Sequence, residues 1–222
     1  NPCHSEAIIN LFMDHADTEW LNMVKGSPAT GMLFFHLFSG PCHRPDGFRS
    51  YVEMLGGKCA DWDIINGDEF NAVDHQQWAL FMRALTVPEN QGLLNGAPCS
   101  TFSRARKGES KHLPRPLRGP SGKERYGLPH LEPHEQEAVR LGTCCAVRGA
   151  EAANYSLDHS LATFSENPDA DEGDISLFNL DEYQAIEARP EVNSIRFVQC
   201  PYNARTAKRS RGQTNIADCN LA

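Results

Sequence analysis

Residues 32–40 read Met-Leu-Phe-Phe-His-Leu-Phe-Ser-Gly, and this stretch decides the fold that we expect. Met32–Phe38 is apolar at almost every position, which is typical of a central parallel strand buried on both faces. The strand ends at Ser39-Gly40-Pro41, and a helix pattern follows from about residue 45 to residue 55. A strand, a glycine turn and a helix in this order open a nucleotide-binding βαβ unit. The sequence therefore predicts an α/β fold, a doubly wound sheet with helices on both faces.

A second strand is expected over residues 58–64, Lys-Cys-Ala-Asp-Trp-Asp-Ile. An acidic residue at the end of such a strand, roughly twenty positions after the glycine turn, is what a pair of ribose hydroxyls requires. Asp61 and Asp63 are both candidates for this contact, and Asp63 is favoured by its position. The alternative is that they are solvated aspartates of a loop. Gly40, which has no side chain, would let a ligand approach the backbone closely.

The next strand, Gly92-Leu93-Leu94, leads into Asn-Gly-Ala-Pro-Cys-Ser-Thr-Phe-Ser at residues 95–103. Pro98 fixes the backbone just before Cys99 and leaves the thiol at the rim of the sheet. Open α/β sheets place their reactive groups at that rim. The sequence therefore predicts a reactive thiol at Cys99, and the alternative is a buried packing thiol.

A basic stretch follows the thiol over residues 103–125, where eight basic and two acidic side chains give a net charge of about +6. The stretch is too long for an ordinary connection, so it is either functional or disordered. A lone thiol beside it indicates a nucleophile next to a polyanion. We expect the stretch to be mobile without nucleic acid and ordered with it. The candidate contacts to nucleic acid are Ser103, Arg104, Arg106, Lys107, Arg115 and Arg118.

The second half of the chain continues the alternation of helices and strands. Residues 131–153 are expected to be helical, and a strand over 161–165 ends at Glu166-Asn167-Pro168. Residues 177–187 are expected to be helical and 194–199 to form a late strand. Behind this strand lies a second basic cluster, formed by Arg205, Lys208, Arg209 and Arg211.

The whole chain has 222 residues, a formal net charge of −8 and 40% hydrophobic residues, enough for a sizeable core. We expect a helical extension over residues 1–30, with a helix at 5–24, and one domain over 31–222. No run approaches the length of a membrane span, and no signal peptide pattern is found. The eight cysteines form no CxxC pair and do not cluster with histidines at zinc spacing. We therefore expect no metal and reduced thiols in an intracellular protein, nuclear in a eukaryote and otherwise cytoplasmic.

The order of these motifs resembles the C5-cytosine methyltransferase family, from about Leu33 to Asn215. Phe38-Ser39-Gly40 is similar to the family's Phe-x-Gly cofactor turn, and Ala97-Pro98-Cys99-Ser100 is similar to its Pro-Cys-Gln motif. Glu166-Asn167-Pro168 resembles its Glu-Asn-Val, and Arg209-Ser210-Arg211 resembles its Arg-x-Arg. A longer pattern, Pro-Cys-Ser-Thr-Phe-Ser-Arg-Ala-Arg at residues 98–106 followed by Arg115-Pro116-Leu117-Arg118, also resembles divergent members of the family carried in mobile elements and viruses.

The resemblance implies a methyltransferase that uses S-adenosyl-L-methionine to methylate C5 of cytosine in DNA. Cys99 would add to C6 of the base, Glu166 would hold and protonate N3, and Arg209 or Arg211 would contact the base carbonyl or a phosphate. The flipped base would be covered by the basic stretch. The implied cofactor contacts are Phe38, Ser39, Gly40, Asp61, Asp63 and Pro98.

The sequence departs from the family at several positions. Pro41 and Cys42 stand where the family usually continues with glycine, Ser100 replaces Gln, and Pro168 replaces Val. No separate target-recognition domain of the usual size is present. These departures favour the alternative of a catalytically inactive methyltransferase fold that binds cofactor or nucleic acid. A further alternative is methylation of tRNA, which one branch of the family performs with the same motifs.

Overall fold

The computed structural model describes residues 32–42, 44–45, 47–103, 106, 114–171, 173–198 and 209–217. The expected extension over 1–30 and its helix lie outside these residues. The chain divides into two compact units. Unit 1 comprises the described residues of Asn1–Gly96 together with Tyr155–Ala162, and unit 2 comprises those of Ala97–Asn154 and Thr163–Ala222.

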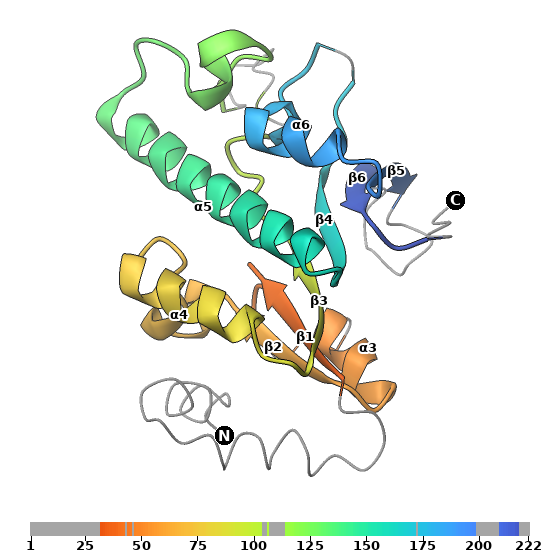
Figure 1. Cartoon of the computed structure of the whole chain (residues 1–222). Coiled ribbons are helices and arrows are strands. Elements are labelled where there is room, and N and C mark those ends of the chain that lie inside the picture. Colours follow the sequence, from red (N-terminus) through yellow and green to blue (C-terminus); the bar gives the residue numbers. More distant parts are fainter. Residues whose placement is uncertain are drawn as a thin grey trace. The chain divides into compact units, whose positions relative to one another are not determined.

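Unit 1 holds three parallel strands in the order β2-β1-β3 (Figure 1). They are β1 (Leu33–Leu37), β2 (Lys58–Trp62) and β3 (Asn90–Asn95). Helix α3 (Phe48–Met54) joins β1 to β2, and helix α4 (His75–Leu85) joins β2 to β3. The predicted strand, turn and helix are confirmed, and so is the α/β class. Because β2 and β3 lie on opposite sides of β1, the strand order reverses at the end of β1.

The two helices of unit 1 cover opposite faces of these strands. Phe34 and His36 contact Phe48 of α3, with ring centroids 6.1 and 5.6 Å apart. Phe35, whose side chain points the other way along β1, contacts Phe81 of α4 at 5.9 Å. The expectation of helices on both faces is therefore confirmed for unit 1.

Helix α4 begins where its sequence supplies a cap. The Asp74 carboxylate accepts hydrogen bonds from the backbone N–H groups of Gln76 and Gln77, at 2.8 and 3.0 Å. Trp78 and Phe81 stand three residues apart on its buried face and stack with ring centroids 5.2 Å apart. Full burial of a side chain of this size stabilises the fold by about 1.5–3 kcal/mol. Two short 3₁₀ helices precede α4, η1 (Ile64–Asn66) and η2 (Asp68–Phe70).

Unit 2 contains antiparallel pairs in the order β4-β6-β5. Strand β4 (Ala162–Pro168) belongs to unit 2 from Thr163 on, and the other two are β5 (Asn193–Val198) and β6 (Arg209–Thr214). Two sequence expectations change here. Glu166-Asn167-Pro168 lies inside β4 instead of following it. Arg209 and Arg211, expected only as part of a basic cluster, lie in a strand.

The helices of unit 2 bury small and apolar side chains. Helix α5 (Pro133–Asp158) runs in unit 2 as far as Asn154 and is rich in buried alanines. The shorter helical segments are η4 (Gly122–Tyr126), η5 (Leu177–Asn179) and α6 (Asp181–Glu187). Among the described residues, no helix is long and apolar enough to cross a membrane.

The basic stretch is packed where the structure describes it beyond residue 113. Leu117 is 1% exposed and forms a cluster with Leu131 and Val139 of unit 2. The backbone N–H of Leu128 donates to the carbonyl of Leu117 at 2.9 Å. This part of the stretch is therefore held by a hydrophobic core, which the sequence analysis did not anticipate.

Candidate functional site

A glycine turn lies at the end of β1 in unit 1, where the strand order reverses. Phe38 and Gly40 both have positive φ, at 59° and 69°. Gly96, which follows β3, donates its N–H to the Leu37 carbonyl at 3.0 Å. A Cβ added to Gly96 would lie 3.4 Å from the Phe38 carbonyl oxygen, so the two loops touch here. Open α/β sheets bind their ligands at this point of the fold.

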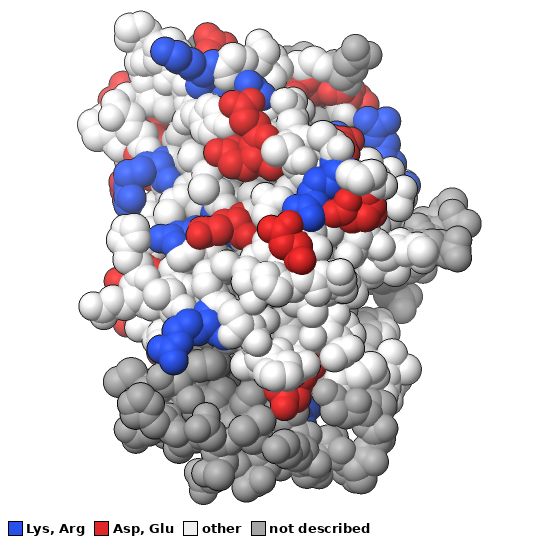
Figure 2. Space-filling model, viewed as in Figure 1, with Lys and Arg blue, Asp and Glu red and all other residues white. Residues whose placement is uncertain are grey.

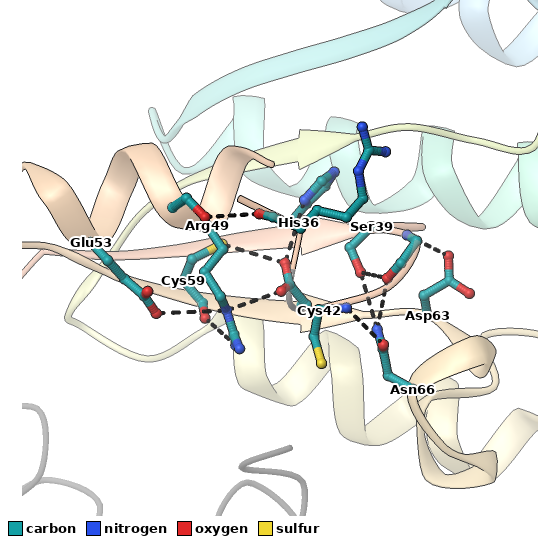
Figure 3. Close-up of polar contacts among 12 residues, drawn as sticks. His36, Ser39, Cys42, Arg49, Glu53, Cys59, Asp63 and Asn66 are labelled. Atoms are coloured by element: carbon teal, nitrogen blue, oxygen red, sulfur yellow. Dashed lines mark hydrogen bonds and ion pairs between the residues drawn. The ribbon is translucent and has the colours of Figure 1, made fainter. Parts of the chain in front are cut away.

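Asp63 and Asn66 hold the glycine turn in shape (Figure 3). The N–H of Gly40 donates to Asp63 Oδ2 at 2.9 Å, and that of Ile65 donates to Asp63 Oδ1 at 3.1 Å. The side-chain amide of Asn66 donates to the Gly40 carbonyl at 2.9 Å and accepts from the N–H of Cys42 at 3.0 Å. Asn66 was not among the residues predicted from the sequence, although the Asn66-Gly67 pair marks a turn.

Asp61 lies inside unit 1 and is 6% exposed. Its carboxylate pairs with Arg49 Nε at 3.0 Å and lies 3.4 Å from His36 Nδ1. The Cys59 thiol donates to the same carboxylate at 3.7 Å. Burial, followed by the charge of Asp61, raises the pKa of Cys59. Because it is buried and its charge is paired with Arg49, Asp61 does not fit a ribose contact, whereas Asp63 is only half-buried.

The turn itself leaves room for a ligand. A Cβ added to Gly40 would meet nothing within 4 Å, so the space above this residue is open. The hollow beside the turn, lined by His36 and Ser39 among others, has a volume of about 10 Å³, roughly the space of one water. The open side of Gly40, next to Asp63, can therefore take a ligand group, whereas the hollow beside the turn holds about one water.

The Pro-Cys turn belongs to unit 2. Cys99 is a free, half-buried thiol, and its carbonyl accepts from the N–H of Phe102 at 2.9 Å. Asn167 of β4 donates its side-chain amide to the Ala97 carbonyl at 2.8 Å, across 70 positions of sequence. Both Asn167 and Ala97 are almost fully buried. The structure thus connects the Pro-Cys turn with Asn167, while Glu166, the residue before it in β4, projects to the opposite face of the strand.

The strand register separates Glu166 from Arg211. Glu166 lies opposite Gly212 of β6, and Asn167 lies opposite Arg211. Directly opposite residues of antiparallel strands project to the same face, whereas successive residues alternate. Glu166 therefore lies on one face of β4-β6-β5, and Asn167 and Arg211 lie on the other.

Arg209 shares the face of Arg211, and both are committed to ion pairs. Arg209 pairs with Asp169 at 3.1 Å and with Asp171 at 3.2 Å. Arg211 pairs with Glu187. Both arginines therefore lie on the face opposite to Glu166, and the expected contact of either with the base carbonyl or a phosphate stays a prediction. These arginines instead line a cleft of about 390 Å³ with Ala170, Asp171, Gly173, Asp174, Ser176, Asn179 and Arg196.

Four of the six predicted nucleic-acid contacts lie in the described residues, and Arg104 and Lys107 lie outside them. Ser103 is half-buried, and Arg106 donates to the Ser100 carbonyl at 2.7 Å. Arg115 is exposed and pairs with Glu135. Arg118 is 1% exposed, so its guanidinium is not available to a phosphate and that expectation is wrong. On the face drawn in Figure 2, basic and acidic side chains are interspersed.

The cysteines do not all follow the expectation of reduced thiols. Cys42 is disulfide-bonded, whereas Cys59, Cys99, Cys144 and Cys145 are free. Within the described part of the chain, no group of His, Cys, Asp and Glu side chains could hold a metal ion.

No protein-family model, no curated protein and no solved structure matches this chain.

Proposed function

We propose that this protein transfers a methyl group from S-adenosyl-L-methionine to C5 of cytosine in DNA through a covalent adduct with Cys99. The observation that carries the proposal is the hydrogen bond from Asn167 to the Ala97 carbonyl. It ties Asn167, the second residue of the Glu-Asn pair, to the turn that presents Cys99, within one compact unit.

The proposed chemistry begins at the thiol. The Cys99 thiolate adds to C6 of the cytosine ring, and Glu166 donates a proton to N3, which offsets the charge of addition. The ring would then be enamine-like, with C5 nucleophilic toward the methyl group that S-adenosyl-L-methionine supplies and S-adenosyl-L-homocysteine as the leaving group. Loss of the C5 proton and of the thiolate, with return of the N3 proton to Glu166, would restore the aromatic ring. In a duplex the base must first be flipped out of the stack.

The proposed cofactor contacts in unit 1 are Phe38, Ser39, Gly40 and Asp63. The open space above Gly40 and the carboxylate of Asp63 beside it support this assignment. When bound, the cofactor supplies an electrophilic methyl group. Asp61 has no part in the proposal, because it is buried and paired with Arg49.

A second candidate function is binding of cofactor or nucleic acid without turnover. The register of β4 and β6 favours it, because it removes Arg209 and Arg211 from the face of Glu166. Methylation of tRNA is the remaining alternative, and it uses the same residues.

Trapping on a 5-fluorocytosine oligonucleotide tests the proposal. Fluorine at C5 blocks the elimination step, so an active enzyme with S-adenosylmethionine should give a covalent adduct that survives a denaturing gel. Cys99→Ala should abolish the adduct, and Cys144→Ala, which removes another free thiol, should retain it. DNA and RNA oligonucleotides separate the two substrates. Binding of S-adenosylhomocysteine by calorimetry without any adduct would replace the proposal with the binding function.

A further inference from the structure

Arg118 is a charged side chain in the interior of unit 2. It is 1% exposed, and each of its guanidinium nitrogens donates a hydrogen bond. Nε donates to the Thr101 hydroxyl at 3.1 Å, and Nη1 donates to the Arg125 carbonyl at 2.9 Å. Nη2 donates to the Val139 carbonyl of α5 at 2.9 Å. One side chain therefore joins the segment after Cys99, the segment at residue 125 and helix α5.

The acceptors of Arg118 are all neutral. Among the described residues, the hydrogen bonds and ion pairs of its guanidinium include no carboxylate. Burial lowers the pKa of Arg118 to about 10. A buried charge without an opposite charge is unfavourable, so packing alone does not account for an arginine here.

The guanidinium also covers the residues that close the Pro-Cys turn. Its central carbon lies 3.9 Å from the centre of the Phe102 ring, a cation–π distance. Phe102 and Thr101 are each 2% exposed. The N–H of Phe102 donates to the Cys99 carbonyl, so whatever holds Phe102 also holds the backbone of Cys99.

Helix α5 provides the space for this arrangement at Gly142. A Cβ at Gly142 would lie 2.6 Å from the Thr101 hydroxyl oxygen and 3.2 Å from Arg118 Nη2. Real Cβ atoms do not approach other heavy atoms to 2.6 Å, so the contact needs a glycine at this position. The turn and Arg118 are therefore packed directly against the backbone of α5.

We propose that Arg118 is a positioning residue for Cys99: it locks Thr101 and Phe102 against α5 and thereby fixes the turn that presents the thiol. The inference rests on the proposed function where it treats Cys99 as the nucleophile. The locking of the turn follows from the contacts alone. Arg115, three residues earlier, is exposed and paired with Glu135 on the surface, so it offers a matched control.

The first measurement is the alkylation rate of Cys99 by iodoacetamide, followed by peptide mass spectrometry, with Cys144 of α5 as the internal reference. Arg118→Met removes the hydrogen bonds that hold the turn against α5. We expect the alkylation rate of Cys99 to rise about tenfold, because local opening of the turn governs the access of the reagent to the thiol. Arg118→Lys should not restore the slow alkylation of Cys99. One ammonium group cannot replace a planar guanidinium that donates to three acceptors in different directions. Arg115→Met should stay within about twofold of the wild type, as surface changes usually do.

The second measurement is the trapping rate on 5-fluorocytosine DNA. It should fall roughly 100-fold in Arg118→Met, the usual cost of a misplacement of about 1 Å at a reacting atom. A wild-type protein that forms no adduct would end the proposed function, whereas the alkylation result would still decide the positioning role.

A milder pair of variants keeps the test decisive if Arg118→Met does not fold. Thr101→Val removes the hydroxyl that accepts from Arg118, and Thr101→Ser retains it. Faster alkylation of Cys99 in Thr101→Val but not in Thr101→Ser supports the positioning role. An unchanged Cys99 rate in folded Arg118→Met, or in Thr101→Val, would overturn it.

Discussion

Replacement of Asn167 by alanine should destabilise the protein by breaking the contact between β4 and the Pro-Cys turn. Asn167 is 1% exposed, and its amide donates to the Ala97 carbonyl at 2.8 Å. Ala97 is itself 3% exposed, so the carbonyl would be left in the interior without its donor. Leaving one buried acceptor unsatisfied costs about 1–3 kcal/mol, and we expect the free energy of unfolding to fall by that amount.

Urea unfolding at pH 7 measures this loss, with Asn193→Ala as the matched control. Asn193 carries the same amide at the exposed start of β5, so its replacement should change the stability by less than about 0.5 kcal/mol. The slope of the transition should stay constant, since the same surface is exposed on unfolding. Alkylation of Cys99 should become faster in Asn167→Ala, because the turn before the thiol loses its anchor.

Asn167→Asp gives a sharper test of the same hydrogen bond. A carboxylate has nearly the shape of the amide but donates no proton, so at pH 7 it should destabilise more than alanine does. At pH 4 part of this loss should be recovered, as the protonated carboxyl group can donate again. If Asn167→Ala costs no more than Asn193→Ala and leaves the Cys99 alkylation rate unchanged, the structural link between the two motifs is wrong.

Three further predictions concern α5, its first turn and unit 1. Gly142→Ala should lower the free energy of unfolding by about 1–3 kcal/mol in a urea titration, because the added Cβ meets Thr101 and Arg118. Alanine by itself favours a helix, so an unchanged or higher stability would refute the close packing at this position. The hydrogen bond from Arg115 holds the pKa of Glu135 at about 2, so this carboxylate stabilises the fold above the unfolded pKa near 4.5 and less as the pH falls toward 2. Melting temperatures of the wild type and Glu135→Gln should therefore converge over that pH range, and a constant difference would contradict the ion pair. Since burial raises the pKa of Cys59, iodoacetamide at pH 8 should label Cys99 at least about tenfold faster than Cys59, as judged by mass spectrometry; equal rates would show that Cys59 is accessible.

Local patterns in the sequence determined most of the fold. The apolar run at 32–38 predicted β1, because a strand buried on both faces needs apolar side chains at successive positions. The glycine after it predicted the turn, because a positive φ favours glycine. Helices α3, α4 and α5 followed from patterns within one segment. Residues 209–214 include two arginines, a serine, a glycine and a glutamine, without the alternation of apolar and polar residues that predicts a strand. The sequence therefore did not predict β6.

The roles of the charged residues were decided only by the tertiary structure. Asp61 and Asp63 stand two positions apart, and the sequence made both of them candidates, with Asp63 favoured by position alone. In the structure, helix α3 brings Arg49 to Asp61, and the glycine turn meets Asp63. Arg118 looks like any residue of a basic stretch, and its burial depends on α5. The separation of Glu166 from Arg211 depends on the pairing of two distant strands, where a shift of one residue exchanges the faces. Contacts between segments far apart in the chain carry this information, and no short stretch of sequence contains it.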